Sequence, residues 1–287
     1  MSLYVLALVL TAAVLHASWN LLAKKTKGKT PFIWLQYIVS NILYLPFLFF
    51  QTKQDYTIYL HLLLWFALSS AVIHLGYFIV LQKGYRSADL SVVYPLARGS
   101  APLVSFIAAI VFLHEQLKLS SIIGLVLIIT GVFIITGLSF KKENNSKMIT
   151  GITYGVLTGL FIALYSFNDA VAVKKFAVPP LILTLSTNLC STALLFPFVL
   201  PQKDALKREI KTHKWIIIAV GLLSPAAYIL VLEALKYAPL SVVAPARETS
   251  ILLGVFMGSK VFNEKDGKRR LIASALILGG IIALSFS

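Results

Sequence analysis

Two arginines stand deep inside apolar stretches of this sequence, where an ionised side chain is costly. Arg98 ends the segment LSVVYPLAR, and Arg247 ends a near-copy of it, LSVVAPAR. A charge at membrane depth costs about 2.5 to 3.5 kcal/mol on insertion scales, so such a residue usually has a function. A guanidinium group offers forked N–H donors that suit carboxylate or phosphonate oxygens. The pair therefore indicates binding of an anionic group, with an internal ion-pair network as the structural alternative.

Other polar side chains within the apolar stretches are candidates to line the same site. In the first stretch His16 and Asn20 lie four residues apart, so they share one helix face. Trp19 beside them is a candidate too, with anchoring at the membrane interface as its alternative role. The remaining candidates for substrate binding are Tyr94, His74, Asn41, Asn188, Asp169 and Glu248. For these side chains, hydrogen bonding between packed helices is the alternative.

Three carboxylates are candidates for coupling transport to protons: Glu233, Asp169 and Glu248. A carboxylate in an aliphatic setting suits this role because burial disfavours its charged form. Glu233 is near the end of its apolar stretch, where reaching the interface is an equally good explanation. Glu248 directly follows Arg247, so it could pair with an arginine or receive a substrate amine.

Several kinds of chemistry find no support in the sequence. The five histidines and the single Cys190 show no metal-ligand spacing, and no nucleophile and base form a recognisable pair. We therefore expect no metal, no cofactor and no enzymatic activity. The net charge of +15 does not indicate nucleic acid, because the basic residues fall in short loops and form no single patch.

The composition indicates which elements hold these residues. With 58% hydrophobic and 13% charged residues among 287, a water-soluble domain could not cover its apolar surface. A helix of about 20 apolar residues crosses a bilayer core of about 30 Å. Such runs lie near 2–23, 31–50, 60–83, 90–113, 119–140, 149–173, 179–200, 214–237, 240–262 and 268–286. They predict an all-α integral membrane protein with ten transmembrane helices.

The chain consists of two related halves. The same 149 residues that separate Arg98 from Arg247 also separate Glu115 from Glu264. We predict a first five-helix repeat over 1–140, a cytoplasmic hinge over 141–148 and a second five-helix repeat over 149–287. Five is an odd number, so the second repeat enters the membrane from the opposite face, and substrate sites characteristically lie where such inverted repeats meet.

The loop charges predict the orientation. Of the 26 Lys and Arg residues, 19 fall in the loops of one side and 5 in those of the other, besides Arg98 and Arg247. The positive-inside rule places the side with 19 in the cytoplasm, so both termini are predicted outside. We expect a multi-pass protein of a bacterial-type cytoplasmic (inner) membrane, as a monomer or a homodimer. The prolines before the two arginines predict kinked or loosened helices there.

The chain resembles the drug/metabolite transporter superfamily, specifically ten-helix carriers of the EamA type. Two five-helix halves carry the resemblance, with the SVV-x-P stretch in each and the glutamates of FLHEQL (Glu115) and VFNEKD (Glu264). It implies a central cavity between the halves, alternating access, and movement of amino acids, related metabolites or organic cations, often outward. From the residues alone we expect both glutamates to hold a helix end or a neighbouring amide.

The leading hypothesis is a secondary transporter that exports small polar metabolites such as amino acids or related carboxylates and phosphonates. Its partners would be a small-molecule substrate, the lipid bilayer and protons as the coupling ion. An exporter of cationic drugs or quaternary amines is the alternative, favoured by the acidic residues and the abundant aromatics. A multipass membrane enzyme or sensor is the alternative from another class.

Overall fold

The computed structural model describes residues 1–24, 26, 30–50, 60–88, 90–116, 118–136, 145–251 and 267–286. Every regular element within these ranges is a helix. The first half contains α1 (Leu3–Lys24), α2 (Thr30–Tyr44), the 3₁₀ helix η1 (Leu45–Phe50), α3 (Leu60–Ser87), α4 (Leu90–Leu113) and α5 (Leu119–Thr136). The second contains α6 (Asn145–Lys175), α7 (Pro180–Val199), the short η3 (Leu200–Gln202), α8 (Lys203–Tyr237), α9 (Leu240–Arg247) and α11 (Gly267–Ser285).

Some helix boundaries differ from the predicted ones. The second apolar run ends in 3₁₀ form as η1, and α8 begins eleven residues before the predicted 214. Of the predicted hinge, residues 141–144 lie outside the described residues, and 145–148 form the first turn of α6. The predicted helix 240–262 is described only as far as Ile251, and α9 itself ends at Arg247.

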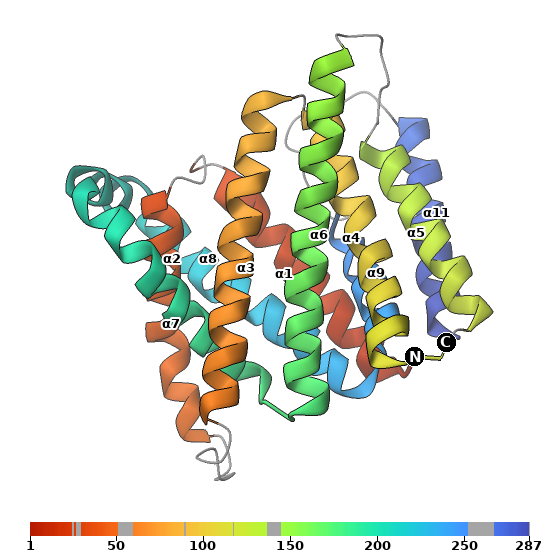
Figure 1. Ribbon diagram of the computed structural model, residues 1–287, viewed down its shortest axis with the longest axis horizontal. Coiled ribbons are helices and arrows are strands. Elements are labelled where there is room, and N and C mark those ends of the chain that lie inside the picture. Colours follow the sequence, from red (N-terminus) through yellow and green to blue (C-terminus); the bar gives the residue numbers. More distant parts are fainter. Residues whose placement is uncertain are drawn as a thin grey trace.

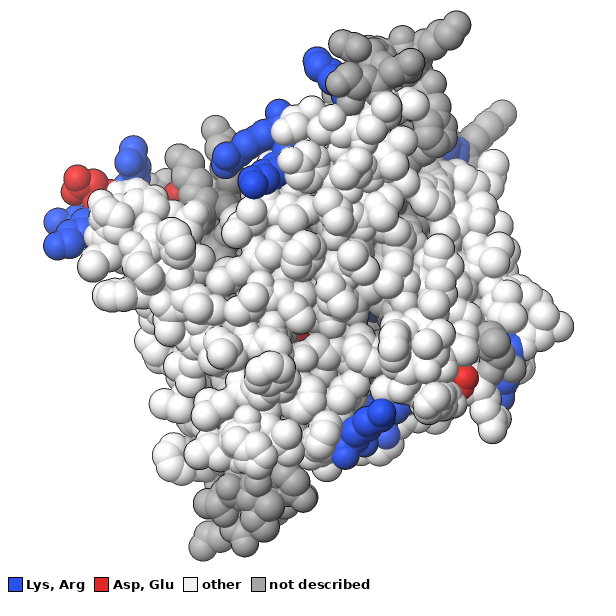
Figure 2. Space-filling view, in the orientation of Figure 1, with Lys and Arg blue, Asp and Glu red and all other residues white. Residues whose placement is uncertain are grey.

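The helices have the length and the surface of membrane spans. Six helical stretches of the described residues are long and apolar enough to cross a bilayer, and Leu119–Ile134 and Ile272–Leu284 are shorter apolar helices. Large apolar side chains such as Phe49 and Trp65 are exposed on the outside of the bundle. Figure 2 shows a broad face of uncharged residues with Lys and Arg gathered toward its edges. This distribution suits a protein surrounded by lipid.

Close helix pairs build the bundle. The closest neighbours are α4 with α6, α5 with α11, α1 with α8, and α3 with α6. Gly159 makes the first pair possible, because a Cβ there would lie 2.0 Å from Ser100 Oγ and 2.9 Å from the Ala97 carbonyl oxygen. Both marked ends of the chain lie near the lower edge of the bundle in Figure 1. Segments from both halves of the sequence therefore share one core.

Candidate functional site

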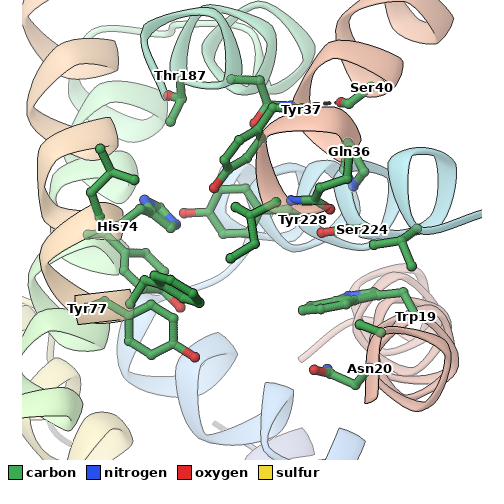
Figure 3. A pocket seen from close by; sticks show the side chains of 18 of the residues that line it. Trp19, Asn20, Gln36, Tyr37, Ser40, His74, Tyr77, Thr187, Ser224 and Tyr228 are labelled. Carbon is green, nitrogen blue, oxygen red and sulfur yellow. Dashed lines mark hydrogen bonds between the residues drawn. The ribbon is translucent and has the colours of Figure 1, made fainter. Parts of the chain in front are cut away.

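A cavity of about 330 Å³ lies among α1, α2, α3, α4, α6, α7 and α8. This volume falls within the range of roughly 300 to 1,000 Å³ that is usual for small-molecule pockets. Figure 3 shows polar and aromatic side chains from several helices around one space. The predicted candidates that line it are His16, Trp19, Asn20, His74, Arg98 and Asn188.

The periodicity of the α-helix brings three residues of α1 to the cavity. His16, Trp19 and Asn20 are three and four residues apart, so they fall on one face of α1. The His16 and Trp19 rings meet edge to face with centroids 4.9 Å apart. Asn20 donates its side-chain amide to the His16 carbonyl oxygen at 2.8 Å. The face is therefore ordered by its own contacts.

Arg98 brings a permanent positive charge to the cavity wall. Its Nη1 lies 3.4 Å from Glu248 Oε2, and its Nη2 lies 3.5 Å from His16 Nε2. The guanidinium carbon lies 5.8 Å from the centroid of the Tyr94 ring. Glu248 is fully buried and does not line the cavity, so it holds Arg98 from behind. A guanidinium has five N–H donors, and the polar contacts of Arg98 with described residues leave some of them for a ligand.

Arg247 occupies the position in the second segment that Arg98 occupies in the first, but it is buried among protein side chains. Only 7% of the residue is exposed, and it does not line the cavity. Its Nη1 donates to Ser166 Oγ at 3.4 Å, and its guanidinium carbon lies 5.9 Å from the Tyr165 ring centroid. Its Nε lies 3.9 Å from Glu248 Oε1. Glu248 therefore sits between the two arginines.

Asp169 is a second buried carboxylate behind the wall, with 0% exposure. Its Oδ2 accepts hydrogen bonds from the Tyr228 hydroxyl and, at 3.1 Å, from Ser70 Oγ. Its Oδ1 accepts from Asn168 Nδ2 at 2.9 Å. Ser70 Oγ also lies 3.3 Å from His74 Nδ1. Since His74 and Tyr228 both line the cavity, Asp169 is one hydrogen-bonded step away from it.

Comparison with known proteins gives the family. The model of the EamA-like transporter family matches residues 3–137 and again residues 149–286. The chain belongs to the EamA-like transporter family. One solved crystal structure of a protein matches with a TM-score of 0.73 at 17% sequence identity, covering 98% of this chain and 96% of that one, which speaks for the fold. No curated protein matches the sequence.

Family membership decides between the broad classes of function. This EamA-like transporter is a multi-pass membrane protein built from two copies of the family's unit. A transporter implies a small-molecule substrate and a surrounding bilayer. Because the family consists of transporters, membership favours transport over an enzymatic role.

Six predicted candidates of the EamA-like transporter do not line the cavity. Arg247, Glu248 and Asp169 lie behind the wall, where each has the buried polar neighbours described above. The other three have partners elsewhere: Tyr94 contacts Arg98, Asn41 Nδ2 lies 3.5 Å from Thr192 Oγ1, and Glu233 Oε1 lies 2.9 Å from Lys236 Nζ at an exposed end of α8. The Glu233 pair matches the interfacial alternative for that residue.

Much of the wall of the EamA-like transporter consists of residues that the sequence analysis did not single out. They are Gln36, Tyr37, Ser40, Tyr77, Thr184, Thr187, Ser224 and Tyr228. Single tyrosines and threonines in an apolar helix look like packing residues, so their types alone gave no signal. A signal was present on α3, where Tyr77, Phe78 and Leu81 share a face with His74 at three- and four-residue spacing.

Glu115 joins the two halves of the EamA-like transporter. Its carboxylate accepts hydrogen bonds from the backbone N–H groups of Leu240 and Ser241, at 2.7 and 3.0 Å, and from Ser241 Oγ at 2.7 Å. Lys174 Nζ lies 2.9 Å from it. Burial alone would raise the pKa of Glu115, but these donors outweigh it and lower the pKa below its usual value. Glu115 thus caps α9; the sequence predicted that it would hold a helix end or a neighbouring amide but not that the helix is α9. Glu264 lies outside the described residues.

Proposed function

We propose that this EamA-like transporter is a secondary exporter of small polar metabolites that carry an anionic group, such as amino acids or related carboxylates and phosphonates. The observation that carries the proposal is Arg98 on the wall of the cavity. Among the described residues that line the cavity, Arg98 has the only permanent charge, and no carboxylate lines it. A guanidinium that is partly desolvated and held from behind binds carboxylate or phosphonate oxygens well.

The aromatic wall adds a second feature of the substrate. Tyr37, Tyr77, Phe78 and Tyr165 line the cavity together with Trp19. Such side chains bury an apolar or planar body while their hydroxyl and indole groups can orient it. The proposed substrate therefore combines an anionic group with a compact organic body.

The proposed architecture is ten spans in two inverted repeats, with both termini outside the cytoplasmic membrane. Figure 1 supports it, since α1 ascends from the lower edge while α6 descends to that edge. On this orientation the cavity lies toward the cytoplasm, because its wall includes Ala23 and Thr30 beside the Lys-rich loop. The other end is held together by the Glu115 contacts and by the Tyr4–Tyr237 ring pair, 5.5 Å apart. We infer an inward-open state of an alternating-access cycle.

Protons are the coupling ion that we propose, with Asp169 as the first candidate. Its hydrogen-bonded partners are all neutral donors, and the chain Asp169–Ser70–His74 leads to the cavity. Glu248 is the second candidate, but it already lies beside two arginines, with Oε2 3.4 Å from Arg98 Nη1 and Oε1 3.9 Å from Arg247 Nε. Glu233 is the weakest, because it is paired at the exposed end of α8.

The alternative within transporters is an exporter of cationic drugs or quaternary amines. The aromatic wall favours it through cation–π contacts. The acidic residues that first suggested it, Asp169, Glu233 and Glu248, do not line the cavity. An enzyme or sensor is disfavoured by the family.

Counterflow into liposomes containing only this protein tests the proposal. Liposomes preloaded with unlabelled compound receive labelled glutamate, phenylalanine, 2-aminoethylphosphonate or tetramethylammonium. We expect exchange of at least one compound with an acidic group and none of tetramethylammonium. Exchange of tetramethylammonium alone would establish the cationic alternative, and chemical conversion without flux would indicate an enzyme. Reporter fusions at the carboxyl terminus test the orientation, and a cytoplasmic signal would reverse it.

A further inference from the structure

The first part of α8 is a separate surface helix at the margin of the bundle. His213 has φ −126° and ψ 19°, which are not helical values, so α8 bends there. Residues 203–212 therefore run in a different direction from the apolar span that follows. Figure 1 shows the junction of α7 and α8 at the side of the bundle farthest from α5 and α11.

A row of lysines follows one face of this helix. Lys203, Lys207 and Lys211, here called the lysine stripe, are spaced by four residues each, and all are exposed; Lys214, beyond the bend, is exposed too. This spacing places them side by side along the helix. Like charges at such spacings repel one another and destabilise an isolated helix. The stripe therefore favours a negatively charged partner.

The protein does not supply that partner within its described residues. No described carboxylate lies within 4.0 Å of a lysine of the stripe. Glu209 in the same helix is buried and is held by His213, with Oε2 2.8 Å from Nδ1. Asp204 is the one exposed acid of the segment, and Arg208 adds a further exposed cation.

The flanks of the stripe suit the surface of a membrane. Trp215, just past the bend, is 71% exposed, and Lys214 Nζ lies 5.3 Å from its ring centroid. Tryptophan with neighbouring lysine is typical of the headgroup region of a bilayer. Leu206, on the inner side of the helix, packs on a cluster that includes Phe32 and Val220, and both of these line the cavity.

We propose that the lysine stripe is a docking surface for the anionic headgroups of phospholipids in the adjoining leaflet. Anionic headgroups supply the negatively charged partner that the described residues do not provide. Each lysine near such a surface raises the binding constant roughly fivefold. Through Leu206, docked headgroups hold the surface helix against the part of α8 that forms the cavity wall. The inference concerns a different surface from the proposed substrate site and does not depend on the substrate.

The full chain in lipid nanodiscs tests this inference. Discs of phosphatidylcholine are compared with discs containing phosphatidylglycerol, and amide hydrogen exchange is measured for residues 203–212. We expect exchange to be roughly fivefold slower or more in the anionic discs, with a higher melting temperature because lipid binds the folded form. In the variant Lys203→Gln/Lys207→Gln/Lys211→Gln this difference should disappear, while Lys207→Gln alone should reduce it in part.

The matched control is Lys83→Gln/Arg86→Gln, which removes two exposed cations at the end of α3. This variant should keep the full effect of phosphatidylglycerol. Equal exchange in both kinds of disc would overturn the proposal, and so would an equal loss of the effect in the control variant. Inorganic phosphate added to phosphatidylcholine discs should not slow the exchange. If it does so to the same extent, the stripe is a site for soluble anions and the proposal is wrong.

Discussion

The helices α4 and α9 carry the same repeated segment, yet the structure uses the two copies differently. Helix α4 continues through Arg98 to Leu113, whereas α9 ends at Arg247. Arg98 lines the cavity, and Arg247 is enclosed by Ser166, Tyr165 and Glu248. In the second copy the loosened helix expected at the proline is present as a break at Glu248, after which residues 249–251 are helical again.

This difference shows that a repeated motif determines where in its helix each arginine lies, but does not determine which side chains surround it. The two arginines share one carboxylate, Glu248, which has no counterpart in the first repeat because Gly99 follows Arg98. A buried cation is tolerated only when its charge is met. The extra acid therefore makes it possible for one arginine to be closed in while the other faces the cavity.

The largest effect is expected for Glu248→Ala, which removes the carboxylate from both arginines. It leaves two guanidinium groups in a buried setting, so the free energy of unfolding should fall by about 3 to 5 kcal/mol. Denaturant unfolding of the purified protein measures this. Glu233→Ala is the control, since its exposed pair with Lys236 should contribute about 0.2 to 1 kcal/mol. Similar losses in both variants would show that the arginines do not depend on Glu248.

Replacing Arg98 and Arg247 by lysine, one at a time, tests whether the two arginines have different roles. Arg98→Lys should weaken binding of acidic compounds by about 1.5 to 3 kcal/mol, because the forked donor is lost where it meets the ligand. Arg247→Lys should instead lower the melting temperature and leave the preference among ligands unchanged. Calorimetric titration and thermal unfolding of the same samples separate the two effects. Equal changes in ligand preference would mean that both arginines bind the anion.

A smaller effect is expected at the beginning of α9, which Glu115 caps. Glu115→Gln should reduce the free energy of unfolding at neutral pH by about 1 to 3 kcal/mol through weaker hydrogen bonds. Because the pKa of Glu115 is lowered in the folded protein, its contribution is complete above the usual value of 4.5 and is lost as pH falls through the folded value. The two proteins should therefore converge in acid. A gap that stays constant in acid would contradict a role of the ionised form.

The sequence predicted the fold class more fully than the site. Hydropathy and the doubled segment indicated an α-helical membrane protein of two related halves, and the family match confirms the resemblance to EamA-type transporters. His16, Trp19, Asn20 and His74 were predicted because intramembrane polar residues are conspicuous, and all four line the cavity. Tyr37, Tyr77 and Tyr228 were missed because each is also a normal packing residue, and only their convergence from different helices makes a cavity.

The sequence by itself determined that this chain must lie in a bilayer, since its composition leaves too few polar residues to cover it in water. It also determined that two buried arginines would need partners. Only the tertiary structure decided which arginine meets the cavity, because that depends on the side chains that α1 and α6 bring to them. His16 arrives beside Arg98, while Ser166 and Tyr165 arrive beside Arg247. Contacts between residues this distant in the chain arise from packing, which no local pattern encodes.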